Sequence, residues 1–185
     1  MKKAVLLGDS IRQIGYGTRV PALLAPDIAV WQPEDNGRFA SYTLRNCFDY
    51  KAELETADVI HWNNGLWDMC DLFGDGSFTP LPVYTDTLVR IAHILQSYCP
   101  RVIFATTTPP RPEMWGHDPE RVKAYNAAAV AALRPLGVRI DDLYSLIAPD
   151  TQHLIRGDDF LHLTDEGIAL TAGQVARSVR EALAE

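Results

Sequence analysis

Short apolar runs alternate with longer amphipathic segments along the whole chain. Each run is rich in residues that favour β-strands and is apolar at nearly every position, as is typical of strands buried on both faces. Parallel sheets covered by helices on both sides contain such strands. The pattern therefore predicts five parallel strands, at Ala4–Leu7, Ile28–Trp31, Val59–Trp62, Val102–Ala105 and Val138–Ile140.

Three of the longer segments have the spacing of helices. Leu81–Tyr98 places apolar side chains at helical intervals and is followed by Pro100, which ends a helix. Pro119–Leu136 is rich in alanine. The last helix is expected to begin at Thr164, a good capping residue that two acidic residues follow. Strands that alternate with helices predict a three-layer α/β/α fold.

Polar side chains follow three of the predicted strands. Ser10 lies just past the first strand in Gly-Asp-Ser, Asn63 and Asn64 follow the third, and Thr107 and Thr108 follow the fourth. In open parallel sheets, sites form at the carboxyl ends of the strands. We therefore expect the functional residues at this edge of the sheet.

Composition and charge narrow the function classes. The 185 residues are 47% hydrophobic and 22% charged, which fits one globular domain over residues 1–185. A formal net charge of −7 argues against nucleic acid or an anionic membrane as a partner. The apolar run after Met-Lys-Lys is only four residues long, shorter than a signal peptide requires. We expect a cytoplasmic protein without a membrane span.

The cysteines and histidines do not form a recognisable metal site. The cysteines, Cys47, Cys70 and Cys99, contain no C-x-x-C pair, so we expect small core residues rather than zinc ligands or a disulfide framework. His61, in the third strand, is expected to be a hydrogen-bonded core residue. No nucleotide-binding glycine motif is present, and no cofactor is expected.

A candidate catalytic pair stands near the other end of the chain, in GDDFLHLTDEG. Asp159 precedes His162 by three residues, a spacing that lets the carboxylate reach the imidazole Nδ1–H in a tight turn. A serine hydroxyl needs such an oriented base to become a nucleophile. Ser10 is the candidate nucleophile, and Asp158 is a less favoured alternative to Asp159 as the partner of the histidine.

Gly8-Asp9-Ser10-Ile11 at the first strand end, together with Asp159-x-x-His162 before the last helix, resembles the SGNH/GDSL hydrolase family. The resemblance covers nearly the whole chain. It implies a flavodoxin-like α/β/α fold and a serine hydrolase that acts on ester bonds. It also implies Ser10 as the nucleophile, His162 as general base and acid, and Asp159 as the residue that orients His162.

The resemblance further implies an oxyanion hole with three donors, of which the backbone N–H of Ser10 is the first. Such donors stabilise the negative charge that develops on the carbonyl oxygen during attack. The second donor in the family is a backbone N–H after the second strand, usually of glycine. Gly37 is the preferred candidate here, and the N–H of Ser41 is the alternative.

The third donor in the family is an asparagine amide within a G-x-N-D motif, and the sequence departs from this motif. When Gly65 and Asp68 are aligned with the motif, Trp67 takes the place of the asparagine. Asn63 and Asn64, just before the glycine, are the candidates to supply the amide instead, with Asn63 slightly preferred.

Two loops at the same edge are rich in aromatic residues. They are Gly65–Pro82 and Thr106–Pro119, and their large side chains either wall an acyl or sugar pocket or pack the rim of the domain. The candidate wall residues are Trp67, Phe73, Met114 and Trp115. Two arginines, Arg12 and Arg111, could contact an anionic or sugar substrate, although solvated arginines are more usual.

The expected function is that of a serine esterase for short acyl esters, acetyl esters for instance, of a carbohydrate or small molecule. Ser10, Asp159 and His162 would form the catalytic triad and pass through an acyl-enzyme. A thioesterase, a lysophospholipase or an acyltransferase with the same triad is an alternative, as is a non-catalytic binding domain on this scaffold. The sequence does not indicate an oligomeric state.

Overall fold

The computed structural model describes residues 1–185, and its strands form one five-stranded parallel sheet. The sheet order is β2-β1-β3-β4-β5, which is the order of flavodoxin-like folds. Each of the five apolar runs forms a strand, so the predicted α/β/α fold class is confirmed. The strands are β1 (Lys2–Leu7), β2 (Ile28–Trp31), β3 (Val59–Asn63), β4 (Val102–Ala105) and β5 (Arg139–Asp141).

The fifth strand lies one residue later than the sequence predicts. Val138 donates its N–H to the carbonyl of Leu133, at the end of the preceding helix, instead of pairing with β4. Pairing begins only at Arg139, which is aligned with Ile103. The contact with the preceding helix therefore sets the start of β5.

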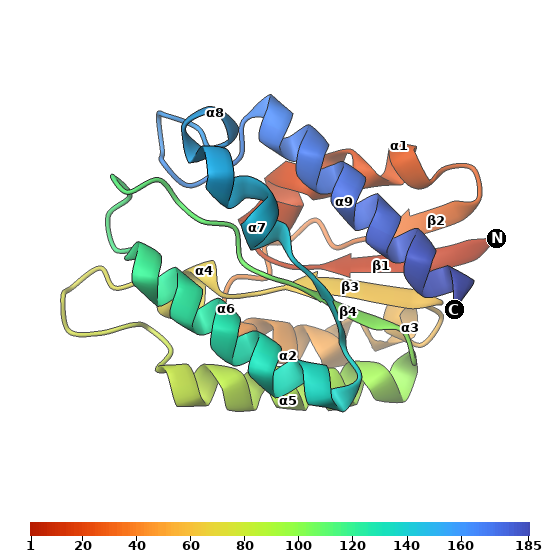
Figure 1. Cartoon of the computed structure of the whole chain (residues 1–185). Coiled ribbons are helices and arrows are strands. Elements are labelled where there is room, and N and C mark those ends of the chain that lie inside the picture. Colours follow the sequence, from red (N-terminus) through yellow and green to blue (C-terminus); the bar gives the residue numbers. More distant parts are fainter.

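Helices cover the sheet on both faces (Figure 1). One face carries the N-terminal and C-terminal helices, α1 (Val20–Leu24), α7 (Leu143–Ile147), α8 (Thr151–Leu154) and α9 (Asp165–Ala184). The other face carries α2 (Ala40–Asp49), α3 (Lys51–Leu54), α5 (Leu81–Tyr98) and α6 (Pro119–Leu133). Short helical turns complete the chain: η1 (Ile11–Gly15), η2 (Tyr16–Thr18), α4 (Leu66–Met69), η3 (Arg134–Leu136) and η4 (Ala148–Asp150).

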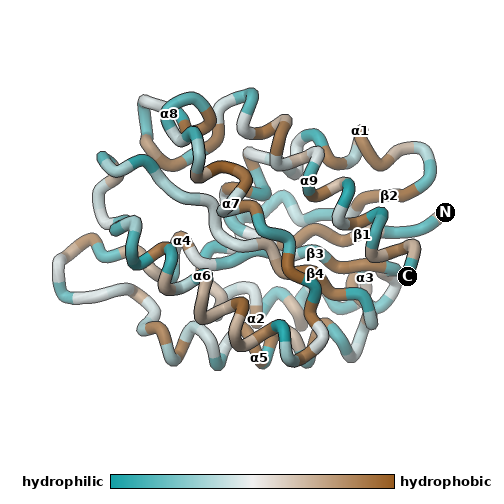
Figure 2. Tube along the Cα trace, in the orientation of Figure 1, coloured by the Kyte–Doolittle hydropathy of each residue, from teal (hydrophilic) through white to brown (hydrophobic).

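Each face of the sheet has its own hydrophobic core of 21 buried residues. Successive residues of β1 point to opposite faces, so Ala4 and Leu6 enter the core under α9 while Val5 and Leu7 enter the core over α5. Figure 2 shows the hydrophobic central strands and the alternating colours of the amphipathic helices on either side. This two-sided burial explains the continuous apolar runs in the sequence.

The predicted helices form where the sequence places them. Leu81–Tyr98 is helical throughout, and the alanine-rich segment is helical to Leu133 and continues as the 3-10 turn η3 to Leu136. Thr164 caps α9 by accepting a hydrogen bond from the N–H of Gly167 at 3.2 Å. No helix of the chain combines the length and the apolar character needed to cross a lipid bilayer. The three cysteines are free and buried, as predicted.

We expect Phe104→Ala to destabilise the protein by about 3–5 kcal/mol, because truncating a buried aromatic ring leaves a cavity. Phe104 has no exposed surface and packs edge-on against Trp62, with the ring centroids 5.0 Å apart. Unfolding in urea, followed by circular dichroism, measures the change. Phe48→Ala is the matched control, because Phe48 is 73% exposed. A loss for Phe104→Ala no larger than for the control contradicts the prediction.

Candidate active site

The serine turn follows β1 at the carboxyl edge of the sheet. Gly8 adopts a positive φ of 154° and lies against the side chain of Asn63 from β3. A Cβ at Gly8 would come within 2.0 Å of the Asn63 Oδ1, so only glycine fits this position. After the glycine, the chain passes through Asp9 and Ser10 into η1.

Asp9 holds the turn from beneath. Its carboxylate is fully buried and accepts hydrogen bonds at Oδ1 from the Ile11 N–H, at 2.9 Å, and from the Asn63 amide, at 2.8 Å. Burial raises the pKa of Asp9, although both hydrogen bonds oppose the rise. These contacts brace the serine turn against β3.

The histidine turn lies between α8 and α9. Asp159 accepts the backbone N–H groups of Leu161 and His162 at Oδ1, at 3.0 and 2.9 Å. Its Oδ2 lies 2.9 Å from the His162 Nδ1. Phe160, between them, adopts a left-handed conformation with a φ of 60°. Such strain is common at functional sites, and here it closes the turn that sets carboxylate against imidazole.

The structure brings Ser10, His162 and Asp159 together across 152 residues of sequence. The Ser10 Oγ lies 2.9 Å from the His162 Nε2, on the side of the ring away from Asp159. Asp158, the alternative partner, instead forms an ion pair with Arg156. The arrangement has the order hydroxyl, imidazole and carboxylate that acyl transfer by a serine requires.

The Asp159 carboxylate is held in its charged form. Burial by itself raises its pKa, but the hydrogen bonds from the backbone of Leu161 and His162 and from the His162 ring together outweigh burial and lower the pKa to about 2. An ionised carboxylate at this position orients the imidazole and stabilises the imidazolium.

Two of the oxyanion candidates are engaged with other groups. The Gly37 N–H donates to the carbonyl of Gly8 at 2.8 Å. The Asn63 amide donates to Asp9, and its Oδ1 accepts the hydroxyl of Tyr16 at 2.8 Å. Asn63 is thus turned toward the underside of the serine turn. The Gly37 N–H would have to give up or share its present partner to bind an oxyanion, and the Asn63 amide would have to bind one with its second N–H from beneath the turn.

Asn64 points to the other side of the strand. Its Nδ2 donates to the carbonyl of Arg38 at 3.1 Å, and its buried Oδ1 has no hydrogen-bond partner. Arg38 belongs to the segment after β2 and has a positive φ of 42°. Tyr84 and Thr107 donate to the Asn64 carbonyl and fix its backbone. Asn64 therefore lies beside the segment from which the family takes its second donor.

Trp67 and Asp68, which align with the last two positions of the G-x-N-D motif, have different surroundings in the structure. The buried Asp68 carboxylate accepts the Ala40 N–H at the start of α2, with oxygen distances of 3.0 and 3.2 Å. It ties α4 to the segment after β2. Burial raises the pKa of Asp68 to about 6. Trp67 is 38% exposed and borders a cavity beside Ser10.

That cavity has a volume of about 470 Å³ and lies against Ser10 and His162. Of the four predicted wall residues, Trp67 and Met114 line it, whereas Phe73 and Trp115 do not. Five further lining residues belong to the two loops that the sequence singles out: Leu66, Cys70, Leu72, Phe78 and His117. The other four come from separate segments with no shared motif, which the sequence pattern does not indicate: Gln13, Ile14, Asn36 and Leu161.

The two arginines hold backbone carbonyls of neighbouring segments. Arg12 is 1% exposed and donates to the backbone carbonyls of Gly8, Pro33 and Asp35, so it is closed to a substrate. Arg111 donates to the carbonyl of Ile155 and so holds the segment before the histidine turn. Neither arginine lines the cavity beside Ser10.

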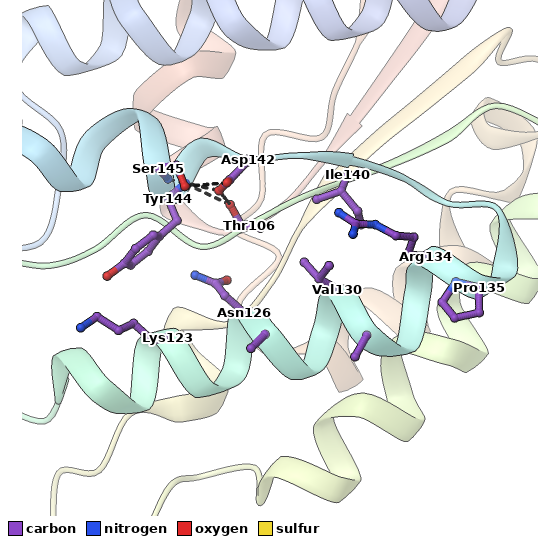
Figure 3. Close-up of a pocket in the computed structure, with 12 residues that line it drawn as sticks. Thr106, Lys123, Asn126, Val130, Arg134, Pro135, Ile140, Asp142, Tyr144 and Ser145 are labelled. Atoms are coloured by element: carbon purple, nitrogen blue, oxygen red, sulfur yellow. Dashed lines mark hydrogen bonds between the residues drawn. The ribbon is translucent and has the colours of Figure 1, made fainter.

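A second cavity, of about 770 Å³, lies between α6 and the β5–α7 segment (Figure 3). It contains neither Ser10 nor His162. Its hydroxyl and carboxylate groups bind one another: Thr106 donates to Asp142, and Ser145 donates to the same carboxylate. These bonds join the end of β4 to α7, and no histidine lines this cavity.

Comparison with known proteins finds an esterase of similar sequence. The chain is 29% identical to the GDSL esterase/lipase CPRD49 of Arabidopsis thaliana in an alignment 201 residues long, which covers 96% of this chain and 78% of that protein. A scan against protein-family descriptions finds no match.

Solved structures share the fold over nearly the whole chain. A lipase/acylhydrolase from Enterococcus faecalis superposes with a TM-score of 0.80 and 21% identity, covering 98% of this chain and 96% of that one. The acetyl xylan esterase AlAXEase has a TM-score of 0.80 and 17% identity, covering 96% and 99%.

Fold and homology together support the class of carboxylic ester hydrolases. Within that class, they confirm the resemblance to the SGNH/GDSL family that the Gly-Asp-Ser and Asp-x-x-His motifs predict.

The raised pKa of Asp68 predicts a pH-dependent contribution to stability. An unfolded aspartate ionises near pH 4, whereas the folded Asp68 keeps its proton to about pH 6. Between pH 4 and pH 6, unfolding therefore releases the proton of Asp68. The contribution of Asp68 to the free energy of unfolding falls as the pH rises through this range. Relative to Asp68→Asn, the free energy of unfolding of the wild type should fall by about 2–3 kcal/mol from pH 4 to pH 7.

Urea unfolding of both proteins at several pH values measures the difference. Asp27→Asn is the control, because it removes an exposed carboxylate elsewhere on the chain. Parallel pH profiles for wild type and Asp68→Asn would contradict the prediction.

Proposed function

We propose that the chain is a serine esterase that hydrolyses short-chain acyl esters, such as acetyl esters, of a carbohydrate or a small molecule. The observation that carries the proposal is the pair of 2.9 Å contacts that link Ser10 to His162 and His162 to Asp159. The acetyl xylan esterase among the structures of similar fold is consistent with a short acyl group.

In the proposed mechanism, the His162 Nε2 accepts the Ser10 proton while the Oγ attacks the ester carbonyl. Asp159 keeps the Nδ1 protonated, so the Nε2 lone pair faces the hydroxyl, and it stabilises the imidazolium that forms. The imidazolium then protonates the leaving alcohol. Water attacks the acyl-enzyme by the reverse roles, releasing the acid and restoring Ser10. This chemistry uses only side chains of the chain itself.

The backbone N–H of Ser10 and the side-chain amide of Asn64 are the favoured donors to the oxyanion. The ester oxygen that becomes the oxyanion should lie on the side of the carbonyl away from His162. Asn64 contacts the segment after β2, whereas Asn63 is turned toward the underside of the serine turn. An amide nitrogen carries two N–H groups, and Asn64 uses one on Arg38. Gly37 is less favoured because its single N–H is already donated to Gly8, and Asn63 is less favoured because its amide is turned toward Asp9, beneath the serine turn.

Ser10→Ala and His162→Ala should each abolish hydrolysis of p-nitrophenyl acetate and labelling by a fluorophosphonate probe. Asp159→Asn should lower kcat by about 10⁴-fold, because the imidazole loses its orienting anion. Circular dichroism establishes that each variant is folded. A folded wild type that neither labels nor cleaves any ester favours the non-catalytic binding domain instead.

Asn64→Ala should lower kcat by about 10²–10³-fold with little change in KM, because the amide acts only when charge develops on the oxyanion. Asn63→Ala should instead lower stability, since it leaves the Tyr16 hydroxyl without its buried acceptor. Steady-state kinetics and thermal unfolding of both variants separate the two roles. Wild-type kcat in Asn64→Ala, with a large loss in folded Asn63→Ala, would reverse the assignment.

A further inference from the structure

Two cavities of unequal size meet at the Ser10–His162 pair. The larger has a volume of about 470 Å³ and the smaller of about 130 Å³. Both are lined by Ser10, Ile14 and His162. An ester attacked by a serine has two parts, the acyl group and the alcohol, on opposite sides of the bond that breaks. Two cavities that flank the reacting hydroxyl can separate these parts.

The larger cavity is suited to an apolar group. Eight of its 13 lining residues are hydrophobic, and none is an acid, a lysine or an arginine. Its two amides each have one polar atom engaged: the Gln13 Nε2 donates to the carbonyl of Glu34, and the Asn36 Oδ1 accepts the N–H of Arg38. Most of the lining is apolar, so a sugar ring bound here would bury more hydroxyls than the few polar side chains can pair, which is costly.

Exposed apolar side chains continue this lining to the surface. Four large residues of the cavity wall are roughly half exposed, which is uncommon for hydrophobic residues gathered at one place. They are Ile14 at 48%, Trp67 at 38%, Leu72 at 42% and Phe78 at 46%. The rings of Trp67 and Phe78 each pack edge-on against Phe39, at 5.5 and 5.9 Å. The aromatic wall is therefore supported and open to an incoming apolar group.

The smaller cavity limits the size of the other group. Its apolar lining includes Ile11, Leu163 and Ile168, and Gly15 contributes no side chain. The only formally charged residue, Arg156, forms an ion pair with Asp158. A volume of 130 Å³ equals that of about four water molecules in the liquid. This is room for an acyl group of two or three carbons, and a longer chain would extend beyond the cavity.

We propose that the smaller cavity receives a short acyl group and the larger cavity receives an alkyl or aryl alcohol. The assignment rests on the proposed function and narrows its substrate class to short-chain esters of apolar alcohols rather than of carbohydrates. The Ser10 Oγ forms the new bond to the acyl carbon while the bond from that carbon to the alcohol oxygen breaks. The alcohol takes the proton from His162 and leaves through the larger cavity; water then frees the acid.

The first test compares esters whose alcohols have similar intrinsic reactivity. Benzyl acetate and hexyl acetate should be hydrolysed with a kcat/KM at least tenfold above that of ethyl acetate and of a mono-acetylated methyl xyloside. Along the series benzyl acetate, propionate, butyrate and hexanoate, kcat/KM should fall at least tenfold beyond propionate. A preference for the sugar ester, or a maximum at hexanoate, overturns the assignment.

Variants on each cavity wall give the second test. Trp67→Ala should raise KM for benzyl acetate about tenfold more than it raises KM for ethyl acetate. Trp115→Ala is the matched control, because Trp115 is 72% exposed and lies outside this cavity. Ile168→Ala should enlarge the smaller cavity and raise the ratio of hexanoate to acetate hydrolysis. Leu170→Ala is its control, on the same helix but outside the cavity lining.

The outcomes separate this assignment from the proposed function. An active enzyme in which Trp67→Ala and Trp115→Ala behave alike, or in which Ile168→Ala leaves the acyl preference unchanged, overturns the cavity assignment alone. A folded wild type that is inactive on every ester and unlabelled by the fluorophosphonate overturns both. Ratios between substrates are measured on the same sample, so partial misfolding of a variant does not imitate the expected shifts.

Discussion

The close approach of Asn63 to the backbone of Gly8 is the contact on which the serine turn depends. A side chain at Gly8 would occupy the place of the Asn63 amide. Because that place is free, the amide reaches Asp9, and Asp9 in turn holds the Ile11 N–H at the start of η1. The Gly8 carbonyl also accepts the Gly37 N–H. One glycine thus joins the first strand, the third strand and the segment after the second.

This rigid turn faces a second, locally determined turn that carries His162. Asp159 binds two backbone N–H groups of its own turn and the imidazole, so the carboxylate is fixed by its neighbours before it meets Ser10. Burial of α9 against the sheet then brings the two turns together. The proposed chemistry therefore depends on two short preorganised segments and on one hydrophobic core that sets their separation.

The cavities around Ser10 and His162 bear on which substrate the proposed catalytic pair can accept. The large cavity is built mainly by α4, the loop after it, η1 and the loop after β4, which all lie outside the sheet. Its apolar lining and the small neighbouring cavity bear on which ester fits, while Ser10 and His162 are shared by both. Under the proposed function, the loops set the specificity and the two turns supply the reacting groups.

The sequence by itself determined the features that arise from local order. Continuous apolar runs identified the strands, Thr164 marked the start of α9, and the three-residue spacing of Asp159 and His162 singled out the pair that the structure brings together. Only the tertiary structure decided the orientation of neighbouring side chains. Asn63 and Asn64 are adjacent in sequence but point to opposite sides, because side chains alternate along a strand. The partner of the Gly37 N–H and the cavity walls likewise depend on contacts between distant segments, which no local pattern encodes.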